Sequence, residues 1–566
     1  MFLKITRSGP RQYLQLVEAF RDETGKAKHR TLVTLGRLDQ LTNSLDSVIS
    51  GLLKATGRPD VLNTTLPAVE FESARALGNV WALTELWGSL GFGELRRVFR
   101  KTRHSIDVEA LIRVMVFNRL CDPESKLGVL RWLETVAMPG IDTESITHQH
   151  LLRSMDALME HQDEVDRVVT RLLRPLIDQD LSVVFYDMTT IRAEGLSEQT
   201  DDVRHYGMAK EGLIARQFML GVVQTGDGLP IYHEVFDGNT AEAPTLVPTI
   251  KKVLQRFESI RRVVLVADRG LLSLDNLDAL QEISLASGQP LEYVLAVPGR
   301  RYREFVDLLG SFHDLKCAHA AEEVIDEMPW RDLRLVVAHN PRAAQEANAM
   351  RRERMASLEA QAAAWVGKLD AQDLGAKARG RKLSDSGAKA RFYHEVREHS
   401  LGNIIKVDLK GELFSYAIDE EALALAELMD GKLLLVTNTR ELSAQAVVTR
   451  YKSLADIERG FRVLKSEIEI GPVFHRLPQR IKAHASICFI ALILYRVMRQ
   501  RLHAAQSEFT PERALEQLQR LQHHEIRINS AAQTLRGISR LSDTHNRVFE
   551  ALNLKKPAQP QQMSLL

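Results

Sequence analysis

Three acidic residues stand where they could bind divalent metal ions together. Asp187 follows the apolar segment 181–186 (LSVVFY), and Asp268 follows the apolar segment 263–267 (VVLVA). Apolar runs of this kind are typical of strands buried on both faces, so the carboxylate at the end of each is placed to point into a shared crevice. Glu458 lies much later, in a segment with helical spacing. Carboxylate oxygens suit Mg²⁺, and two such ions can clamp the attacking and leaving oxygens of an in-line phosphoryl displacement.

The segment that carries Glu458 is predicted to be one helix over residues 451–470. Its apolar positions step by three and four residues, which gives a core-facing stripe: Leu454, Ile457, Phe461, Leu464 and Ile468. Tyr451, Glu458 and Lys465 are spaced seven apart, so they are expected near one face, which Arg462 joins four residues after Glu458.

Each of these features has a simpler alternative. An aspartate at a strand end can cap the next turn, and a charged helix face can simply be solvated. Ser453 and Asp456 resemble a capping box at the start of the late helix. His313, Cys317 and His319 come closest to a cysteine–histidine metal cluster, but they lack a fourth ligand at a recognised zinc spacing. We therefore interpret that grouping as coincidence.

The elements around the two aspartates follow a definite order. Residues 181–298 predict three strands, then a helix, a strand, a helix and a strand, with a hairpin turn at 225–228 (TGDG). This β-β-β-α-β-α-β order is the ribonuclease H-like order. The fold expected is therefore α/β and multidomain, with a ribonuclease H-like core split by a mixed β/α insertion.

A chain of 566 residues is too long for one core, so three or four domains are expected. The predicted divisions run in chain order: a small β meander (1–45), a helical DNA-binding domain (70–178), the first part of the core (180–298), the insertion (299–430), the second part of the core with the Glu458 helix (431–505), and C-terminal helices with a disordered tail (506–566).

The composition limits where DNA could bind. The 75 basic and 74 acidic residues give a net charge of +1, so any DNA-binding surface must be local. One basic stretch, in the predicted insertion, could contact a DNA backbone or be a solvated loop; it includes Lys377, Arg379, Arg381 and Lys382. The three cysteines form no CxxC pair, which favours a reducing cytoplasm. The apolar run Ala485–Tyr495 is too short to span a bilayer and indicates a buried helix.

Taken in order, the segments FYDMTT (185–190), VADRG (266–270) and the helix with Tyr451, Glu458 and Lys465 resemble insertion-sequence transposases of the DDE class. The subgroup resembled carries a Y-(2)-R-(3)-E-(6)-K signature and an insertion before the final glutamate. This chain departs from the signature at Leu454, which stands at the arginine position and leaves Arg459 or Arg462 as substitutes.

The resemblance implies that Asp187, Asp268 and Glu458 form a catalytic triad that holds Mg²⁺ or Mn²⁺, two ions in all. It implies that Tyr451 and Lys465 contact the phosphate backbone at the element's end. The implied partners are double-stranded DNA, as transposon ends and target, and a second copy of the chain on that DNA. Two alternatives stay open: a nuclease or resolvase of the same fold without strand transfer, and an inactive, domesticated DNA-binding relative.

Overall fold

The computed structural model describes residues 1–23, 25–41, 49, 51, 53–56, 69–100, 106–177, 182–195, 201–208, 214–271, 273–374, 383–528 and 534–558. The chain divides into two compact units. Unit 1 comprises Met1–Ala74 and His523–Ile538, and unit 2 comprises Arg75–Gln522 and Ser539–Leu566.

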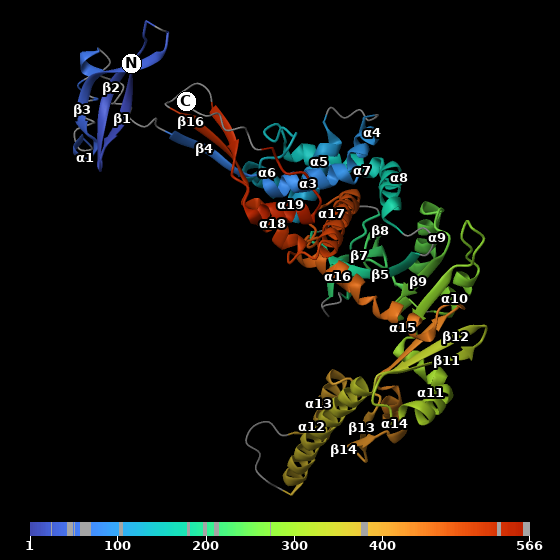
Figure 1. Ribbon diagram of the computed structural model, residues 1–566. Coiled ribbons are helices and arrows are strands. Elements are labelled where there is room, and N and C mark those ends of the chain that lie inside the picture. The colour runs from blue at the N-terminus through green and yellow to red at the C-terminus, as the bar shows by residue number, and fades with distance from the viewer. Residues whose placement is uncertain are drawn as a thin grey trace. The chain divides into compact units, whose positions relative to one another are not determined.

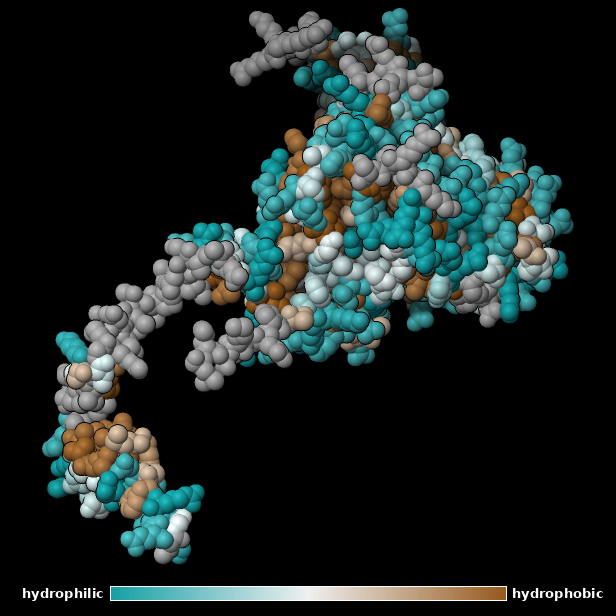
Figure 2. Space-filling model, turned by 90° about the horizontal axis from the view of Figure 1, so that it is seen from above, coloured by the Kyte–Doolittle hydropathy of each residue, from teal (hydrophilic) through white to brown (hydrophobic). Residues whose placement is uncertain are grey.

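Unit 1 is built from antiparallel strands. The first three confirm the expected meander and are joined in the order β1-β2-β3: β1 (Phe2–Ser8), β2 (Arg11–Arg21) and β3 (Ala27–Arg37), followed by the short helix α1 (Leu38–Leu41). Gly9 and Gly25 supply the left-handed backbone of the two turns, with φ of 61° and 79°. Several large apolar side chains of this sheet are exposed, among them Phe2, Leu3 and Ile5, and Figure 2 shows an apolar area on this unit.

A second sheet in unit 1 corrects two predicted boundaries. Its strands are joined in the order β17-β16-β4: β4 (Val69–Ala76), β16 (Gln522–Ile528) and β17 (Thr534–Ile538). β4 lies in the stretch 70–178 that we expected to be helical, and the helices begin at Gly78 instead. The segment VEFESARA alternates apolar and other residues, which is the period of a strand. The C-terminal stretch likewise holds strands β16 and β17 beside its helices, while tail residues 559–566 lie outside the described residues.

The helical part of unit 2 packs around one apolar helix, α17 (Pro478–Ala504). Its partners come from both ends of the chain: α3 (Gly78–Ser89), α5 (Val108–Cys121), α7 (His148–Glu160) and α18 (Pro511–Gln519). Among the described residues α17 alone is long and apolar enough to cross a membrane, and 94% of its most apolar 18-residue window is buried inside the protein. It is therefore a core helix, as expected for Ala485–Tyr495.

The central sheet of unit 2 has nine strands in the order β11-β12-β15-β10-β9-β5-β7-β6, with β8 also paired to β7. In chain order these are β5 (Ser182–Arg192), β6 (His205–Met208), β7 (Ile214–Thr225), β8 (Pro230–Asp237), β9 (Val263–Ala267), β10 (Glu292–Ala296), β11 (Val324–Trp330), β12 (Leu333–His339) and β15 (Lys432–Thr437). β9 is parallel to both β5 and β10, whereas β7 is antiparallel to β5. Helices α9 (Leu246–Arg256) and α10 (Leu274–Gln281) connect β8 to β9 and β9 to β10 (Figure 1).

The predicted hairpin turn is confirmed at residues 225–228. The Gly228 N–H donates to the Thr225 carbonyl at 2.8 Å, and Gly228 has a φ of 77°. Glycine adopts that left-handed conformation without steric cost, so the TGDG sequence turns β7 directly into β8.

The expected insertion 299–430 is smaller than predicted. β11 and β12 belong to the central sheet, because β12 pairs with β15 from Arg334↔Thr437 to His339↔Lys432. The elements inserted between β12 and β15 are α12 (Pro341–Asp373), α13 (Asp385–Glu398), the hairpin β13 (Ile405–Lys410) and β14 (Leu413–Ile418), and α14 (Glu420–Met429) (Figure 1). They have a core of their own around Phe392.

The predicted single helix over 451–470 is wrong in one respect. The chain forms two helices, α15 (Ala444–Lys452) and α16 (Ala455–Ser466), with a turn at Ser453 and Leu454. The Leu454 N–H donates to the Tyr451 carbonyl, three residues back, which tightens the end of α15. Ser453 does not cap α16; its hydroxyl donates to the Thr449 carbonyl at 3.1 Å.

Candidate active site at the carboxyl edge of the central sheet

Asp187 and Asp268 stand on neighbouring parallel strands. β5 and β9 pair in register from Ser182↔Val263 to Tyr186↔Ala267, and Asp187 and Asp268 are the next residues along the two chains. Asp268 follows the end of β9 as expected, but the expectation that Asp187 ends its strand is wrong, because β5 continues to Arg192 through its pairing with β7. Strands in a sheet lie about 4.8 Å apart, which brings the two backbones close at this edge. Asp187 is half-buried and Asp268 is exposed. The Met188 N–H donates to one carboxylate oxygen of Asp187 at 2.7 Å.

Tyr451 reaches this edge from the last turn of α15. Helix α15 packs across β9, β10, β11 and β12, with Val447 and Val448 buried against the sheet. The Tyr451 hydroxyl donates to one carboxylate oxygen of Asp268 at 2.8 Å. Burial of the phenol, followed by the charge of Asp268, raises the pKa of Tyr451 well above its usual value. The phenol therefore stays protonated and remains a donor to Asp268 at neutral pH.

Glu458 lies in the first turns of α16, on the other side of the turn from Tyr451. Its side chain is exposed. The apolar stripe expected for this helix is confirmed at its described positions, with exposures of 8% or less: Leu454, Phe461, Leu464 and Ile468. The side chain of Ile457 lies outside the described residues. The stripe holds α16 against the sheet and leaves Glu458 on the outer side.

A close contact at Gly460 sets the height of α16 above the sheet. A Cβ added there would lie 2.4 Å from Gln224 Nε2 and 3.0 Å from an Nη atom of Arg496. Gln224 is fully buried in β7 and pairs with Phe185 of β5, two residues before Asp187. A Cβ at position 460 would displace the ends of the Gln224 or Arg496 side chains, so the residue two positions after Glu458 is where its helix packs most closely on the sheet beside the strand of Asp187.

The candidate DNA-binding cations fall into two groups. Arg459 and Arg462 are exposed and Lys465 is half-buried, all three on α16. The basic loop residues Lys377, Arg379, Arg381 and Lys382 lie outside the described residues.

Among the described residues, the carboxylate oxygens of Asp187, Asp268 and Glu458 do not all lie within metal-binding distance of one another. Across the described parts of the chain, a different group has its ligand atoms within 4.8 Å of one another: His313, Cys317 and His339. Carboxylates without a cation between them repel one another, and Tyr451 already occupies one oxygen of Asp268.

One contact and one residue of this site were not found from the sequence. The bond between Tyr451 and Asp268 joins positions 183 residues apart, and no local pattern signals it. Gly460 did leave a signal, because a glycine inside a helix destabilises it by up to about 1 kcal/mol relative to alanine and therefore often marks a close contact.

Comparison with known proteins gives two family matches. Residues 178–494 match the model of the transposase DDE domain, and residues 3–64 match the N-terminal domain of IS1634 family transposases. No curated protein matches the chain. Among solved structures, a piggyBac transposase synaptic complex with hairpin DNA is similar at 9% sequence identity and a TM-score of 0.37, with 78% of each chain covered. Because this structural similarity is so low, the family assignment rests on the two family models.

Proposed function

The chain belongs to the family of transposases with a DDE domain, and from that premise we propose that Asp187, Asp268 and Glu458 hold the metal ions with which it cleaves and joins DNA. The protein is a DNA transposase of the insertion-sequence type, and its family depends on divalent metal. The observation that carries the proposal is the register of β5 and β9, which brings Asp187 and Asp268 side by side at the point where β9 ends.

We assign the central sheet to the ribonuclease H-like fold. The order of its elements supports this assignment, with antiparallel strands β5, β7 and β8 followed by α9, β9, α10 and β10. In such sheets ligands bind outside the carboxyl ends of the strands; Asp268 directly follows the last residue of β9, and Asp187 lies beside it inside β5.

The residues present fit Mg²⁺ or Mn²⁺. Asp187 and Asp268 offer hard carboxylate oxygens at an edge that is partly open to solvent. Bound there, two divalent ions would activate water and then a DNA 3′-hydroxyl as nucleophiles and stabilise the charge that develops on the phosphate. Glu458 would complete the ligand set by a movement of α16 or of its own exposed side chain.

The chain's own residues would position the DNA. Arg459, Arg462 and Lys465 place three cations on α16, the helix of Glu458, where they would contact phosphate oxygens and offset the missing arginine at Leu454. Tyr451 would release Asp268 when metal binds, and its hydroxyl would then be free to donate to a phosphate. The basic loop with Lys377, Arg379, Arg381 and Lys382 would add backbone contacts.

Two element ends must be processed together, so we expect a homodimer on the DNA. Its substrates would be the terminal repeats and then the target duplex, in the cytoplasm where both are accessible.

The test is cleavage of a labelled duplex that carries the element's end, with Mg²⁺ or Mn²⁺, followed by capture of target DNA. Asp187→Asn, Asp268→Asn and Glu458→Gln should each abolish cleavage and joining but leave mobility-shift binding largely intact. Asp275→Asn is the matched control, because Asp275 is an exposed aspartate in the first turn of α10.

The outcomes separate the three residues. Full cleavage by any one variant removes that residue from the site. Cleavage without joining by the unmodified protein would indicate a nuclease or resolvase, and binding without cleavage would indicate an inactive relative.

A further inference from the structure

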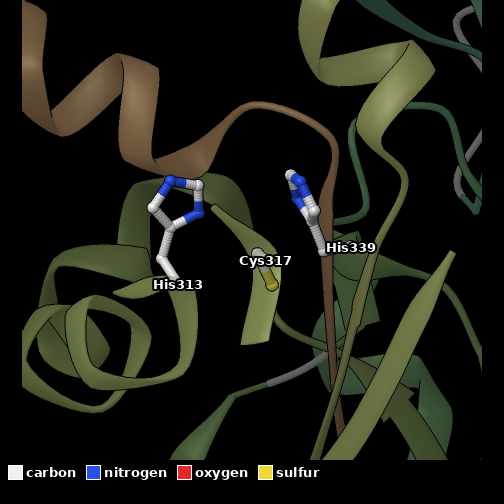
Figure 3. Close-up of side chains that lie close together, drawn as sticks. All are labelled: His313, Cys317 and His339. Carbon is white, nitrogen blue, oxygen red and sulfur yellow. The ribbon is translucent and has the colours of Figure 1, made fainter. Parts of the chain in front are cut away.

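Three potential metal ligands meet where the insertion leaves the central sheet. His313 and Cys317 are the two ends of the π-helical turn η7 (His313–Cys317), which continues α11 (Val306–Phe312). His339 is the last residue of β12. Their ligand atoms all lie within 4.8 Å of one another, and Figure 3 shows Cys317 between the two histidines. His319, which we grouped with His313 and Cys317 from the sequence, is not in this cluster.

The π-helical turn brings the first two ligands together. The Ala318 N–H donates to the His313 carbonyl at 3.0 Å, five residues back. Wide turns of this kind are rare in helices and frequently lie at functional sites. The two imidazole rings lie edge to face, with an interplanar angle of 88° and centroids 5.7 Å apart.

The cluster contains a buried polar atom that lacks a partner. Cys317 and His339 are each only 4% exposed, and Nδ1 of His339 is buried without a hydrogen-bond partner. Buried side-chain nitrogens are normally hydrogen-bonded, because an unpaired one costs free energy. A bound metal ion is one way for this atom to gain a partner.

The chemistry of the three side chains selects the metal. A thiolate and two imidazoles form a soft to borderline ligand set, which suits Zn²⁺ with three protein ligands and one further ligand, and does not suit Mg²⁺. Imidazole coordinates metal in its neutral form.

The side chain of Lys432 already lies beside this cluster. Lys432, opposite His339 in the β12–β15 ladder, brings its Nζ to 3.1 Å from His313 Nδ1, and it donates to the Leu428 carbonyl at 2.6 Å. An ammonium and a metal ion compete for the same imidazole.

We propose that His313, Cys317 and His339 form a Zn²⁺ site at the root of the insertion, and that Lys432 takes the place of the metal ion when the site is empty. His339 is the last residue of β12, one residue before α12 begins, and Lys432 is the first residue of β15, where the chain re-enters the sheet. Zinc would thus tie η7 to the exact point at which the inserted chain leaves the sheet. This site is separate from the carboxylates and does not depend on their role.

The test uses the full chain with Asp187→Asn and Asp268→Asn, so that metal on those carboxylates does not interfere. Titration of the metal-free protein with Co²⁺ should give one equivalent of a cobalt–thiolate charge-transfer band that Zn²⁺ displaces. Cys317→Ser should remove the band, and His339→Ala or His313→Gln should weaken Zn²⁺ binding by more than about tenfold. Lys432→Met, which removes the competing cation, should tighten it.

Matched controls are available for each ligand. Cys121→Ser and His319→Gln should leave the band unchanged. One equivalent of Zn²⁺ should also raise the thermal midpoint of the unmodified protein but not that of Cys317→Ser, because a ligand that binds only the folded state stabilises it. The absence of a cobalt–thiolate band in the parent protein, or a band that survives Cys317→Ser, overturns the proposal. If Cys317→Ser fails to fold, unchanged Zn²⁺ affinity in His313→Gln overturns it equally.

Discussion

Replacing Gly460 with alanine tests whether the close packing of α16 on the sheet at Gly460 sets the position of Glu458. The added Cβ would lie 2.4 Å from Gln224 Nε2, whereas ordinary contact starts at 3.4 Å, so the neighbours must separate by about 1 Å (3.4 − 2.4 Å). The contacting atom is the end of the Gln224 side chain, which is itself fully buried, so we expect part of the displacement to pass to the helix. A misplacement of about 1 Å can cost on the order of 100-fold in rate.

The effect on stability should be much smaller than the effect on rate. Overpacking costs about 1–3 kcal/mol, and alanine recovers up to about 1 kcal/mol because it favours the helix over glycine. Gly460→Ala should therefore fold, with a free energy of unfolding lowered by no more than about 2 kcal/mol, and cleave DNA about 100-fold more slowly.

The assay is single-turnover cleavage of the labelled element end with Mg²⁺, beside urea unfolding of the same preparation. Gly367→Ala is the matched control, since Gly367 lies inside α12 with no other atom within 4 Å of the added Cβ. Adding Gln224→Ala to Gly460→Ala should restore part of the rate, because it removes the atoms in contact. A folded Gly460→Ala that cleaves at the parent rate would refute the idea that this contact positions Glu458.

Three further predictions follow from single contacts. Tyr451→Phe removes the hydrogen bond to Asp268 and should lower the free energy of unfolding by about 0.5–1.5 kcal/mol in urea titration; because Asp268 is exposed, a loss above about 3 kcal/mol would contradict this account. Arg462→Ala should reduce the slope of log affinity against log salt by about 1 for all duplexes alike, and an unchanged slope would mean that Arg462 contacts no phosphate. Burial lowers the pKa of His233 to about 3, so the unfolded chain, with a histidine pKa near 6.5, binds the extra proton. Stability should therefore fall as pH drops from about 6.5 toward 3, by up to about 1.4 kcal/mol per pH unit from this residue, and His233→Gln should flatten that fall in unfolding curves; an unchanged profile would contradict it.

The strands that carry the aspartates could be predicted because their signals are local. The run before Asp268 is apolar over the whole of β9, the run before Asp187 forms the first part of β5, and the TGDG turn fixes the hairpin that follows. The order of elements then made an adjacent pair of strand ends plausible. Family membership agrees with the resemblance found in the motifs.

Other features depend on tertiary contacts and escaped prediction. A regular 3-4 apolar stripe continues across Leu454, so periodicity alone could not reveal the turn between α15 and α16. β11 and β12 were placed in the insertion because strand pairing with β15, about a hundred residues later, leaves no mark in the sequence. His339 joins His313 and Cys317 only through that pairing, whereas His319 is nearer along the chain and stands apart.

The insertion leaves and re-enters the central sheet at a single pair of facing residues, which we call the rung. His339 and Lys432 are paired across β12 and β15, and the Asn340 N–H donates to the Gly431 carbonyl at 2.9 Å just outside that rung. The ends of the inserted chain are thus held together whatever lies between them, and the entropy cost of closing such a loop grows only with the logarithm of its length, about 0.6 kcal/mol per doubling. Segments of very different size could therefore be exchanged at this rung during evolution while the sheet edge that carries Asp187 and Asp268 kept its geometry.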